Sequence, residues 1–409
     1  MRIAIATEVF LPKIDGITNR LRNTIRCLVE QGHEVLVIAP AGSVPEYAGA
    51  RVLAVPGPPF PPYPGLRICL PDPRILWQLY RFRPDVLHAV GPACLGLWTM
   101  LAARLLRIPV VASYHTDLPR YLRGYGLGLL QACIWPLIRR IHGLAQRNLC
   151  PSTFTKHELE AHGIEDVGIW RGGVDTQLFH PAKRDDGMRA RMASGGETAR
   201  PVLLYAGRVA PEKGLHLLRP ALAELPGCDL AIVGDGPARA DLERLFAGTR
   251  TRFVGFLRGE ELAAAFASAD LFVMPSKTET LGFVVLEAMS SGSRSSPRTP
   301  GIPTWSRTRR RVHSSTPRTR APSSGRFARS SWIPIAAGPP PRARAFAETC
   351  DWPSETQGLV GQYEHDRAAG HGQRHSEADL AATASRRLNG GNRAGRSATR
   401  PHAGRSVIA

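Results

Sequence analysis

The sequence predicts an α/β fold with two doubly wound, Rossmann-like domains that face each other across a cleft. Two observations support this prediction. Short apolar runs alternate with amphipathic stretches of helical period, and the whole pattern starts again at Pro201. Strands that are apolar throughout are typical of a parallel sheet covered by helices on both faces. Ligands in such sheets bind beyond the carboxyl ends of the strands, so we expect the chemistry there.

The expected elements follow one another in a regular order. In the first half, strands are predicted at 2–7, 34–40, 85–90 and 108–113, and helices at 17–31 and 97–107. In the second half, strands are predicted within 201–207, 228–236, 251–256 and 270–276, again with helices between them. The stretch PFPPYPG at 59–65 reads as a surface loop, because proline cannot donate to a strand ladder.

Composition narrows the class of protein. The 409 residues suffice for two to three domains, and the net charge is +19. Residues 293–409 hold 20 Arg and no Lys, whereas residues 1–292 carry only +6. The seven Cys form no CxxC pair, so we expect reduced thiols and no zinc site. No apolar run is long enough to span a membrane, and a strand that starts at residue 2 argues against a signal or transit peptide.

A glycine follows the first predicted strand. Gly16 lies in IATEVFLPKIDGITNRL, between that strand and the first helix. A glycine there lets the backbone approach a phosphate, and the helix N-terminus supplies N–H donors. The loop is not GxGxxG, which counts against a nicotinamide enzyme, and a simple turn glycine is the alternative.

Two cations follow the first strand of the second half. Arg208 and Lys213 lie five residues apart in YAGRVAPEKG, in a loop that opens a helix. The guanidinium fork of Arg and the point charge of Lys suit a diphosphate. The alternative is an ordinary solvated loop, since most charged side chains belong there.

Two carboxylates flank the start of a later helix. Glu279 and Glu287 in SKTETLGFVVLEAMSSG are eight residues apart, with Gly282 and Phe283 between them. Glu279 precedes the helix and can face a bound sugar, while Glu287 lies little more than one turn inside and could reach a ribose diol. Backbone N–H groups near Gly282 and Phe283 would face a phosphate. A metal site is the alternative, but no His or Asp stands at ligand spacing.

Together these motifs resemble the retaining glycosyltransferases of the GT-B fold, in the large family that includes lipid-directed mannosyl- and sulfoquinovosyltransferases. The resemblance covers residues 1–292. Glu279 and Glu287 match the family's E-x7-E motif, and GRVAPEKG matches its diphosphate-binding Arg and Lys. GGVDTQLFHP, at 172–181, resembles the hinge between the two domains.

Three further strings extend the resemblance. ASYHTDLPRY resembles the segment that carries the family's sugar-contacting histidine, here His115. VGDGP, which contains Gly234, and FVGF, which ends at Phe256, resemble the strand ends that bracket the nucleotide base. The resemblance therefore implies a nucleotide-sugar donor in the cleft.

The resemblance also implies a mechanism for a retaining hexosyltransferase that needs neither metal nor cofactor. Arg208, Lys213 and helix N-termini would neutralise the departing diphosphate. Glu279 would hold hydroxyls of the donor sugar, Glu287 the ribose, and His115 would contact the sugar near its C6 side. Front-face attack by the acceptor hydroxyl would retain the anomeric configuration. The implied donor-binding set is Gly16, Arg208, Lys213, Gly234, Phe256, Gly282, Phe283 and Glu287.

Within this family, several strings resemble those of plant and cyanobacterial sulfoquinovosyltransferases. We therefore expect transfer of sulfoquinovose from UDP-sulfoquinovose to diacylglycerol. The expected location is inside the cell and peripheral on a membrane, at the cytoplasmic face or at a plastid envelope or thylakoid. A GDP-mannose-dependent lipid α-mannosyltransferase shares nearly every motif and is the first alternative. Alternatives of other classes are an inactive frameshifted product and an Arg-rich nucleic-acid-binding protein, although we expect no nucleic-acid partner.

One apolar stretch bears on the acceptor. Residues 125–147 are apolar with a cationic end, which fits either a patch on a membrane surface or a core helix. The pairs Arg120 with Arg123 and Arg139 with Arg140 are candidates to hold a sulfonate or lipid headgroups. His88, alone in DVLHAV, reads as a strand-end residue and not as a catalyst.

The sequence changes character after Gly292. The family continues there with a buried apolar strand, whereas this chain continues SRSSPRTPGIPTWS, which we do not expect to form that strand. Residues 293–347 contain 12 Arg and no Lys, Asp or Glu. In a shifted reading frame, the codons of 293–306 permit LPVVAA followed by a Gly-containing turn. We therefore interpret 293–340 as an out-of-frame segment and not as a functional basic tail.

The organisation expected from these observations has five parts. They are an acceptor-side Rossmann-like domain at 1–180, the in-frame part of a nucleotide-sugar-binding domain at 181–292, the out-of-frame segment at 293–340, closing helices at 341–367 and a disordered tail at 368–409. With a central piece of its second domain replaced, the chain as written is expected to have doubtful activity.

Overall fold

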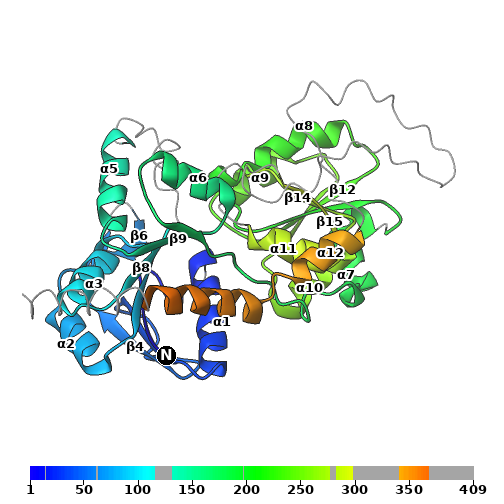
Figure 1. Ribbon diagram of the computed structural model, residues 1–409. Helices are drawn as coiled ribbons and strands as arrows, with labels where there is room; N and C mark the ends of the chain where they lie inside the picture. The colour runs from blue at the N-terminus through cyan, green and yellow to red at the C-terminus, as the bar shows by residue number, and fades with distance from the viewer. Residues whose placement is uncertain are drawn as a thin grey trace, which may run out of the picture.

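The computed structural model describes residues 1–13, 15–60, 63–115, 131–196, 198–276, 282–297 and 340–367. Two parallel sheets, one for each half of the chain, organise these residues (Figure 1). The larger sheet has eight strands, of which only the last pair is antiparallel. In their order across the sheet they are β10 (Val167–Ile169), β9 (Arg147–Cys150), β8 (Val110–Ser113), β7 (Val86–Val90), β1 (Arg2–Thr7), β2 (Glu34–Pro40), β4 (Ala50–Val55) and β3 (Glu46–Tyr47).

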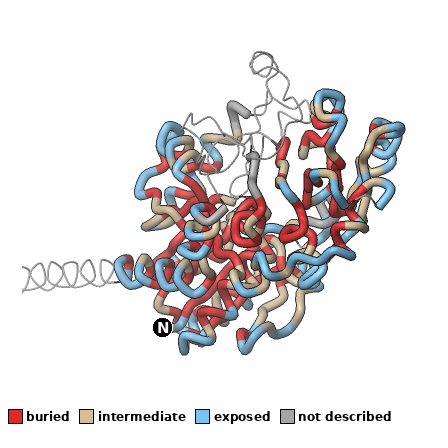
Figure 2. The backbone as a smooth tube through the Cα atoms, turned by 90° about the vertical axis from the view of Figure 1, so that its right-hand side faces the viewer, coloured by how far each residue is buried: buried red, intermediate tan, exposed pale blue. Residues whose placement is uncertain are grey.

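Helices cover both faces of the first sheet. They are α1 (Gly16–Glu30), α2 (Pro73–Phe82), α3 (Cys94–Leu105), α5 (Gln131–His142) and α6 (Thr153–Ala161). Asp15, Asp72 and Ser152 cap three of them, each accepting a hydrogen bond from a backbone N–H of the first turn. The central strands are buried along nearly their whole length, as the apolar runs predict (Figure 2).

The second sheet has five parallel strands. In their order across the sheet they are β13 (Thr251–Gly255), β12 (Asp229–Val233), β11 (Val202–Ala206), β14 (Leu271–Met274) and β15 (Arg294–Pro297). The helices around it are α7 (Asp186–Met192), α8 (Leu218–Ala223), α9 (Arg239–Leu245), α10 (Gly259–Ser268), α11 (Phe283–Ser290) and α12 (Pro340–Glu348). Short 3₁₀ turns are η2 (Pro181–Lys183), η3 (Ser194–Gly196), η4 (Pro211–Lys213) and η5 (Leu215–Leu217).

Both sheets have the strand order of a doubly wound fold. The order reverses between β1 and β7 in the first sheet and between β11 and β14 in the second. At such a switch point the connections leave toward opposite faces, which opens a crevice at the carboxyl ends of the strands. The GT-B architecture expected from the sequence, with two Rossmann-like domains, is confirmed.

The last described helix, residues 352–367, returns to the first domain, and we call it the return helix. In Figure 1 it is the orange helix that extends from the second domain to the first. Its Leu359, Val360 and Tyr363 belong to the same buried cluster as Ile3 and other residues of β1. Its Asp366 pairs with Arg147 of β9 at 2.8 Å. The first domain therefore takes part of its core from the far end of the described chain.

Two segments cross between the domains and pack against each other. The backbone N–H of Val174 donates to the carbonyl of Cys350 at 2.9 Å, and Val174 forms a β-bridge with Asp351. A Cβ on Gly173 would lie 2.6 Å from the backbone nitrogen of Trp352, so only glycine allows this approach. The segment 172–181, predicted as the hinge, is thus one of two segments that pass between the domains side by side.

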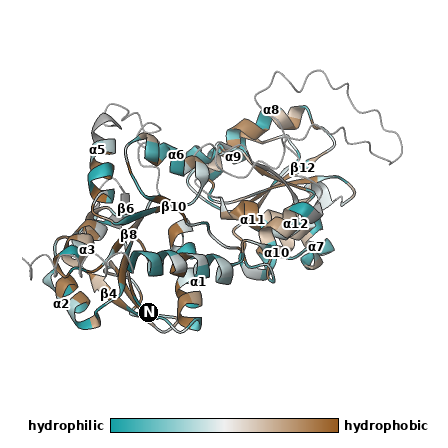
Figure 3. Ribbon diagram, in the orientation of Figure 1, coloured by the Kyte–Doolittle hydropathy of each residue, from teal (hydrophilic) through white to brown (hydrophobic). Residues whose placement is uncertain are grey.

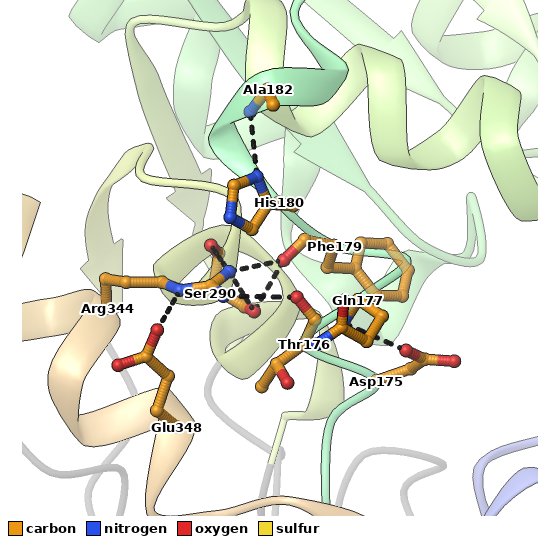
Figure 4. A network of polar contacts seen from close by, with 9 residues as sticks. All are labelled: Asp175, Thr176, Gln177, Phe179, His180, Ala182, Ser290, Arg344 and Glu348. Carbon is orange, nitrogen blue, oxygen red and sulfur yellow. Dashed lines mark hydrogen bonds and ion pairs between the residues drawn. The ribbon is translucent and has the colours of Figure 1, made fainter.

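Arg344 of α12 joins the segment 172–181 to the end of α11 (Figure 4). Its Nη1 donates to the carbonyls of Phe179 at 2.9 Å and Ser290 at 2.6 Å. Its Nη2 donates to the carbonyl of Thr176 at 3.2 Å, and its Nε pairs with Glu348 at 2.7 Å. A cation at the C-terminus of α11 also meets the negative end of that helix. Residues of α12, which follow the segment 293–340, therefore complete the second domain.

Helix α11 is apolar over most of its length (Figure 3). Val285, Leu286, Ala288 and Met289 are buried in the second core, together with Ala343 and other residues of α12. Contact with the sheet on one side and with α12 on the other explains why most of its side chains are apolar.

The structure differs from two of our expectations. Residues 59–65, expected to be a loop, contribute to a small antiparallel pair, β5 (Pro59–Phe60) with β6 (Tyr63–Arg67). The expectation that the chain after Gly292 forms no strand is wrong for residues 294–297, which pair in parallel with β14 from Leu271 to Met274. Strand pairing uses main-chain groups, so an edge strand next to β14 does not require apolar side chains.

Candidate active site

The second switch point brings two of the predicted motifs together. The loop with Arg208 and Lys213 follows β11, and the segment that leads to α11 follows the neighbouring β14. A Cβ on Gly214, directly after Lys213, would lie 3.2 Å from the carbonyl oxygen of Pro275. The two loops therefore touch, and the cation loop lies beside the approach to α11.

The backbone of the cation loop is fixed while the Arg208 side chain is exposed. The buried Tyr205 donates its hydroxyl to the carbonyl of Arg208 at 2.8 Å. The guanidinium is 54% exposed and has a long ion-pair distance of 3.9 Å to Glu212. Lys213 ends the 3₁₀ turn η4 and is partly exposed. This geometry leaves the Arg208 cation accessible to an anion at the strand ends.

The ends of β11 and β12 approach each other at backbone distance. Gly234 follows β12 with a φ of +127°, and a Cβ there would lie 2.0 Å from the carbonyl oxygen of Gly207. The N–H of Gly234 donates to Gly255 at 2.8 Å, and that of Gly207 donates to Val233 at 3.0 Å. The predicted Gly234 is therefore required by the packing of the strand ends themselves.

Phe256 presents an exposed ring at the end of β13. The side chain is 57% exposed, and the guanidinium of Arg258 lies 4.6 Å from the ring centroid. An exposed aromatic ring at the carboxyl edge of the sheet offers a face on which a planar base can stack.

The start of α11 carries the remaining predicted residues of this domain. Gly282 precedes the helix in the left-handed conformation, with a φ of +68°, and no side chain caps the first turn. Glu287 lies in the second turn and is partly buried, and burial raises its pKa from 4.5 to about 7. Its carboxylate is therefore poorly solvated and would be stabilised by hydroxyl donors. Glu279 lies outside the described residues.

In the first domain, Gly16 and His115 lie at carboxyl ends of two strands. Gly16 is the first residue of α1 and is exposed, and a Cβ there would meet nothing within 4 Å. His115 follows β8 and is partly buried, with its Nε2 at 2.9 Å from Oγ of Ser113. Its ring meets that of Trp170 edge-on, with centroids 5.2 Å apart.

Arg20, which the sequence did not single out, joins the two domains at this edge. The side chain is 2% exposed, and Nη1 donates to the carbonyl of Trp170 at 2.8 Å. Its Cζ lies 4.6 Å from the Trp170 ring centroid and 5.2 Å from that of Phe283 on α11. Burial lowers the pKa of Arg20 to about 9, so it is a cation at neutral pH. The predicted Phe283 thus contacts the first domain through Arg20.

The prediction that His88 is a strand-end residue is wrong. His88 lies in the middle of β7, completely buried, with hydrogen-bonding partners at both ring nitrogens. Tyr363 of the return helix is one of these partners. A histidine inside an otherwise apolar strand was the available signal, since a buried imidazole needs partners that the local sequence does not supply.

The apolar stretch 125–147 is described from residue 131 onward. In α5, Ile138 is buried, whereas Leu137 is 51% exposed and Arg139 and Arg140 are exposed. One apolar side chain of this helix, Ile138, thus packs inward, and another, Leu137, faces outward. Arg120 and Arg123 lie outside the described residues. No group of three or more His, Cys, Asp or Glu side chains is placed to hold a metal ion in the described parts of the chain.

Comparison with known proteins identifies the family of the chain. The profile of Glycosyltransferase Family 4 matches residues 14–178, and that of Glycosyl transferases group 1 matches residues 200–294. Sulfoquinovosyl transferase SQD2 of Arabidopsis thaliana is 42% identical over 284 residues, which are 68% of this chain and 56% of that protein. The chain thus spans little more than half the length of the plant enzyme. A GDP-mannose-dependent alpha-mannosyltransferase of Mycolicibacterium smegmatis is 41% identical over 71% of this chain and 78% of that protein.

Solved structures share the fold at low identity. HepE of Anabaena, determined in complex with UDP and glucose, superposes with a TM-score of 0.61 at 17% identity, over 88% of this chain and 99% of that chain. The catalytic domain of Starch Synthase IV from Arabidopsis thaliana, bound to ADP and acarbose, has a TM-score of 0.59 at 17% identity, over 90% of this chain and 99% of that chain. The chain belongs to the GT-B glycosyltransferases, with a family 4 first domain and a group 1 second domain.

Proposed function

We propose that this glycosyltransferase moves sulfoquinovose from UDP-sulfoquinovose to diacylglycerol, with retention of the anomeric configuration. The observation that carries the proposal is the 42% identity to a sulfoquinovosyl transferase over 284 residues, which are 68% of this chain. A nucleotide-sugar donor agrees with the exposed Arg208, the exposed Phe256 ring and the uncapped start of α11.

The donor would lie along the carboxyl edge of the second sheet. Arg208 and Lys213 would hold the diphosphate, and the N–H groups at Gly282 and Phe283 would add donors at a helix N-terminus. Glu287 would accept hydrogen bonds from the ribose hydroxyls, and Phe256 would stack on the base, beside Gly234. Glu279 would hold hydroxyls of the sugar. These roles need no metal ion and no cofactor, because the diphosphate charge is met by side-chain cations and backbone dipoles.

The reaction would take place between the domains. The acceptor hydroxyl oxygen forms a bond to the anomeric carbon on the face from which the diphosphate departs. The bond between that carbon and the diphosphate oxygen breaks, and the acceptor proton passes to the departing phosphate. Arg208 and Lys213 would stabilise the charge that develops there, and His115 would position the sugar. Gly16, at the open start of α1, would face the donor from the first domain.

A second donor is favoured by a specific observation. Three relatives at 38–41% identity are described as GDP-mannose-dependent α-mannosyltransferases, and two of them match over 77–78% of their own length. A lipid mannosyltransferase would use the same diphosphate and ribose contacts, and would differ at the base and at C6 of the sugar.

The deciding experiment tests which of the two donors is used and whether diacylglycerol is the acceptor. Purified protein is incubated with UDP-sulfoquinovose or with GDP-mannose, each with diacylglycerol vesicles, and the lipid products are identified by mass spectrometry. A sulfoquinovosyl diacylglycerol formed only with the first donor is the expected result. A mannosylated lipid formed only with GDP-mannose would replace the proposal by its alternative, and hydrolysis of either donor without lipid product would refute the proposed acceptor.

A lipid acceptor requires access to a membrane, and one surface of the first domain suits it. Trp77, Tyr80 and Leu105 on the neighbouring α2 and α3 are 52–72% exposed. The guanidinium of Arg81 lies 5.4 Å from the Trp77 ring centroid, and Arg104 is exposed beside Leu105. Aromatic rings interleaved with cations fit an anionic lipid surface. No helix in the described parts of the chain is long and apolar enough to cross a bilayer. We propose peripheral attachment through this surface.

We also propose that residues 293–340 are translated out of frame. The in-frame residues on either side fold together, since Arg344 binds carbonyls at 176, 179 and 290. Resequencing the DNA across codons 288–345 is the test. An uninterrupted frame that encodes the written residues would overturn the interpretation, and would make the Arg-rich segment a genuine part of the protein.

A further inference from the structure

A chain of hydrogen bonds connects His115 to the return helix through the interior of the first domain. The Tyr363 hydroxyl lies 2.6 Å from Nδ1 of His88, and Nε2 of His88 lies 2.8 Å from Oγ of Ser113. The same Oγ lies 2.9 Å from Nε2 of His115. Tyr363, His88 and Ser113 are at most 1% exposed, so water does not compete along the chain.

The buried hydroxyl of Tyr363 determines which group is the donor in each of these hydrogen bonds. Among the described residues, the Tyr363 hydroxyl has His88 as its one hydrogen-bond partner. A phenol that accepted a proton from His88 would leave its own O–H buried without an acceptor, which is unfavourable. Tyr363 therefore donates to Nδ1 of His88.

The other bonds follow from this first one. When Nδ1 of His88 accepts, the ring of a neutral imidazole carries its proton on Nε2 and donates to Ser113. The Ser113 hydroxyl then donates its single proton to Nε2 of His115. His115 is left with its proton on Nδ1, which has no partner among the described residues.

Both imidazoles are in an environment that keeps them neutral. Burial lowers the pKa of His88 to about 3, with a further contribution from the cation of Arg20. Burial also lowers the pKa of His115 well below its usual value, and Arg20, His88 and His142 act in the same direction. A neutral imidazole has one donor and one acceptor, so its tautomer determines what it can offer a ligand.

We infer that Tyr363 and His88 are positioning residues that hold His115 as the Nδ1–H tautomer, so that it offers an N–H donor to the sugar of the nucleotide-sugar substrate. The inference rests on the proposed role of His115 as the sugar-contacting histidine. An N–H donor suits a group rich in lone pairs. A sulfonate oxygen can only accept, and a hydroxyl can accept as well as donate. The return helix thereby takes part in substrate recognition from outside the cleft.

The alternative is that these hydrogen bonds only hold the return helix against the sheet and do not affect the tautomer of His115. The Tyr363 ring meets that of His88 at 73° with centroids 5.7 Å apart, and this packing survives removal of the hydroxyl. Tyr363→Phe therefore separates the hydrogen bond from the packing. Tyr47→Phe on the edge strand β3 is the matched control, since it removes a tyrosine hydroxyl elsewhere in the first domain.

The test uses the full chain labelled with ¹⁵N-histidine, with His115→Asn to assign the signal. Long-range ¹H–¹⁵N spectra report which ring nitrogen carries the proton. We expect the Nδ1–H tautomer in the unaltered protein and in Tyr47→Phe, and a mixture of tautomers in Tyr363→Phe. We expect kcat/KM for the donor to fall by about 10- to 100-fold in Tyr363→Phe, in the range found for lost supporting contacts. Thermal unfolding should stay cooperative.

A second variant protects the test. Ser113→Ala interrupts the chain in the middle and should give the same loss of tautomer preference. A proton on Nε2 of His115 in the unaltered protein, or an unchanged tautomer and kcat/KM in both variants, would overturn the inference. If the unaltered protein transfers neither sugar, the proposed function fails, and the spectra alone still decide whether Tyr363 sets the tautomer of His115.

Discussion

The two domains share one topology and differ in how they present their switch points. In the second domain, the strand ends meet through glycines at 207 and 234, and the charged groups lie on exposed loops. In the first domain, the corresponding edge is built from the rings of His115 and Trp170, with His88 behind them and the buried cation of Arg20 stacked on Trp170. The comparison teaches that the same fold can present charge on exposed loops in one domain, and packed rings around a single buried cation in the other.

The largest effect is expected on the charged side. Arg208→Ala removes an exposed cation from the proposed diphosphate site, so we expect kcat/KM to fall by about 10²–10³-fold, as for other groups that stabilise developing charge. The melting temperature should not change, because the side chain is more than half exposed. Steady-state transfer assays measure the first and thermal scans the second. Arg244→Ala, on exposed α9, is the control, and an equal loss in both variants would contradict the assignment.

The glycine contact between strand ends should be sensitive to a single methyl group. Gly234→Ala places a Cβ 2.0 Å from a backbone oxygen and at a φ of +127°, so we expect a loss of about 3 kcal/mol or more in the free energy of unfolding. Gly248→Ala has a similarly positive φ of +74° but open space around it, and should lose about 1 kcal/mol. Denaturant unfolding measures both. Similar losses would show that backbone strain, and not the close approach, dominates.

We expect the ionised carboxylate of Glu287 to lower the stability of the fold. Burial raises its pKa from 4.5 to about 7, so the folded state binds the proton more tightly than the unfolded state. Its contribution to stability is present below pH 4.5 and is lost as the pH rises toward 7, a change of about 1–3 kcal/mol. Glu287→Gln removes this dependence. We expect the variant to be more stable than the unaltered protein at pH 8 and nearly equal at pH 4.

The same variant should bind the donor poorly, because an amide replaces the carboxylate that we propose accepts hydrogen bonds from two ribose hydroxyls. Calorimetry with UDP at pH 8 should show at least about a tenfold weaker affinity, while the unaltered protein should itself bind more weakly as the pH falls below 7. Glu224→Gln, exposed at the end of α8, should change neither property. A Glu287→Gln protein with full affinity for UDP would remove Glu287 from the donor site.

The smallest effect is expected at the proposed membrane surface. Trp77→Ser should reduce binding to anionic vesicles by about three- to tenfold, and should leave hydrolysis of the soluble donor unchanged. Sedimentation with vesicles measures binding. Leu245→Ser, which alters an exposed apolar side chain of the second domain, should bind as the unaltered protein does. Equal binding by all three proteins would exclude this surface as the attachment site.

Sequence patterns predicted the elements of the fold because apolar runs and helical periods are local. The strands at 2–7 and 34–40 begin and end as predicted, and the predicted helix at 17–31 is displaced by one residue. The edge pairing of 294–297 was missed, because main-chain pairing next to β14 does not depend on apolar side chains.

More of the proposed donor site than of the first domain's interior could be predicted from the sequence. Arg208 and Gly282 stand in short continuous motifs that follow strands, so their common position at the sheet edge follows from topology. Arg20, His88 and Tyr363 are brought together over separations of 68 to 343 residues, and nothing in their local sequences specifies a partner. Their contacts depend on the tertiary fold alone.

The return helix also sets an order of events during synthesis. Domains generally fold as units as they leave the ribosome, with the N-terminal domain first. Here Leu359, Val360 and Tyr363 complete the core around β1, although they follow Arg2–Thr7 by more than 350 residues in the sequence. The first domain is made first but its core is closed last. A chain that stops within residues 293–340 would leave that core open, with apolar residues of β1 and α1 exposed to water and to other nascent chains.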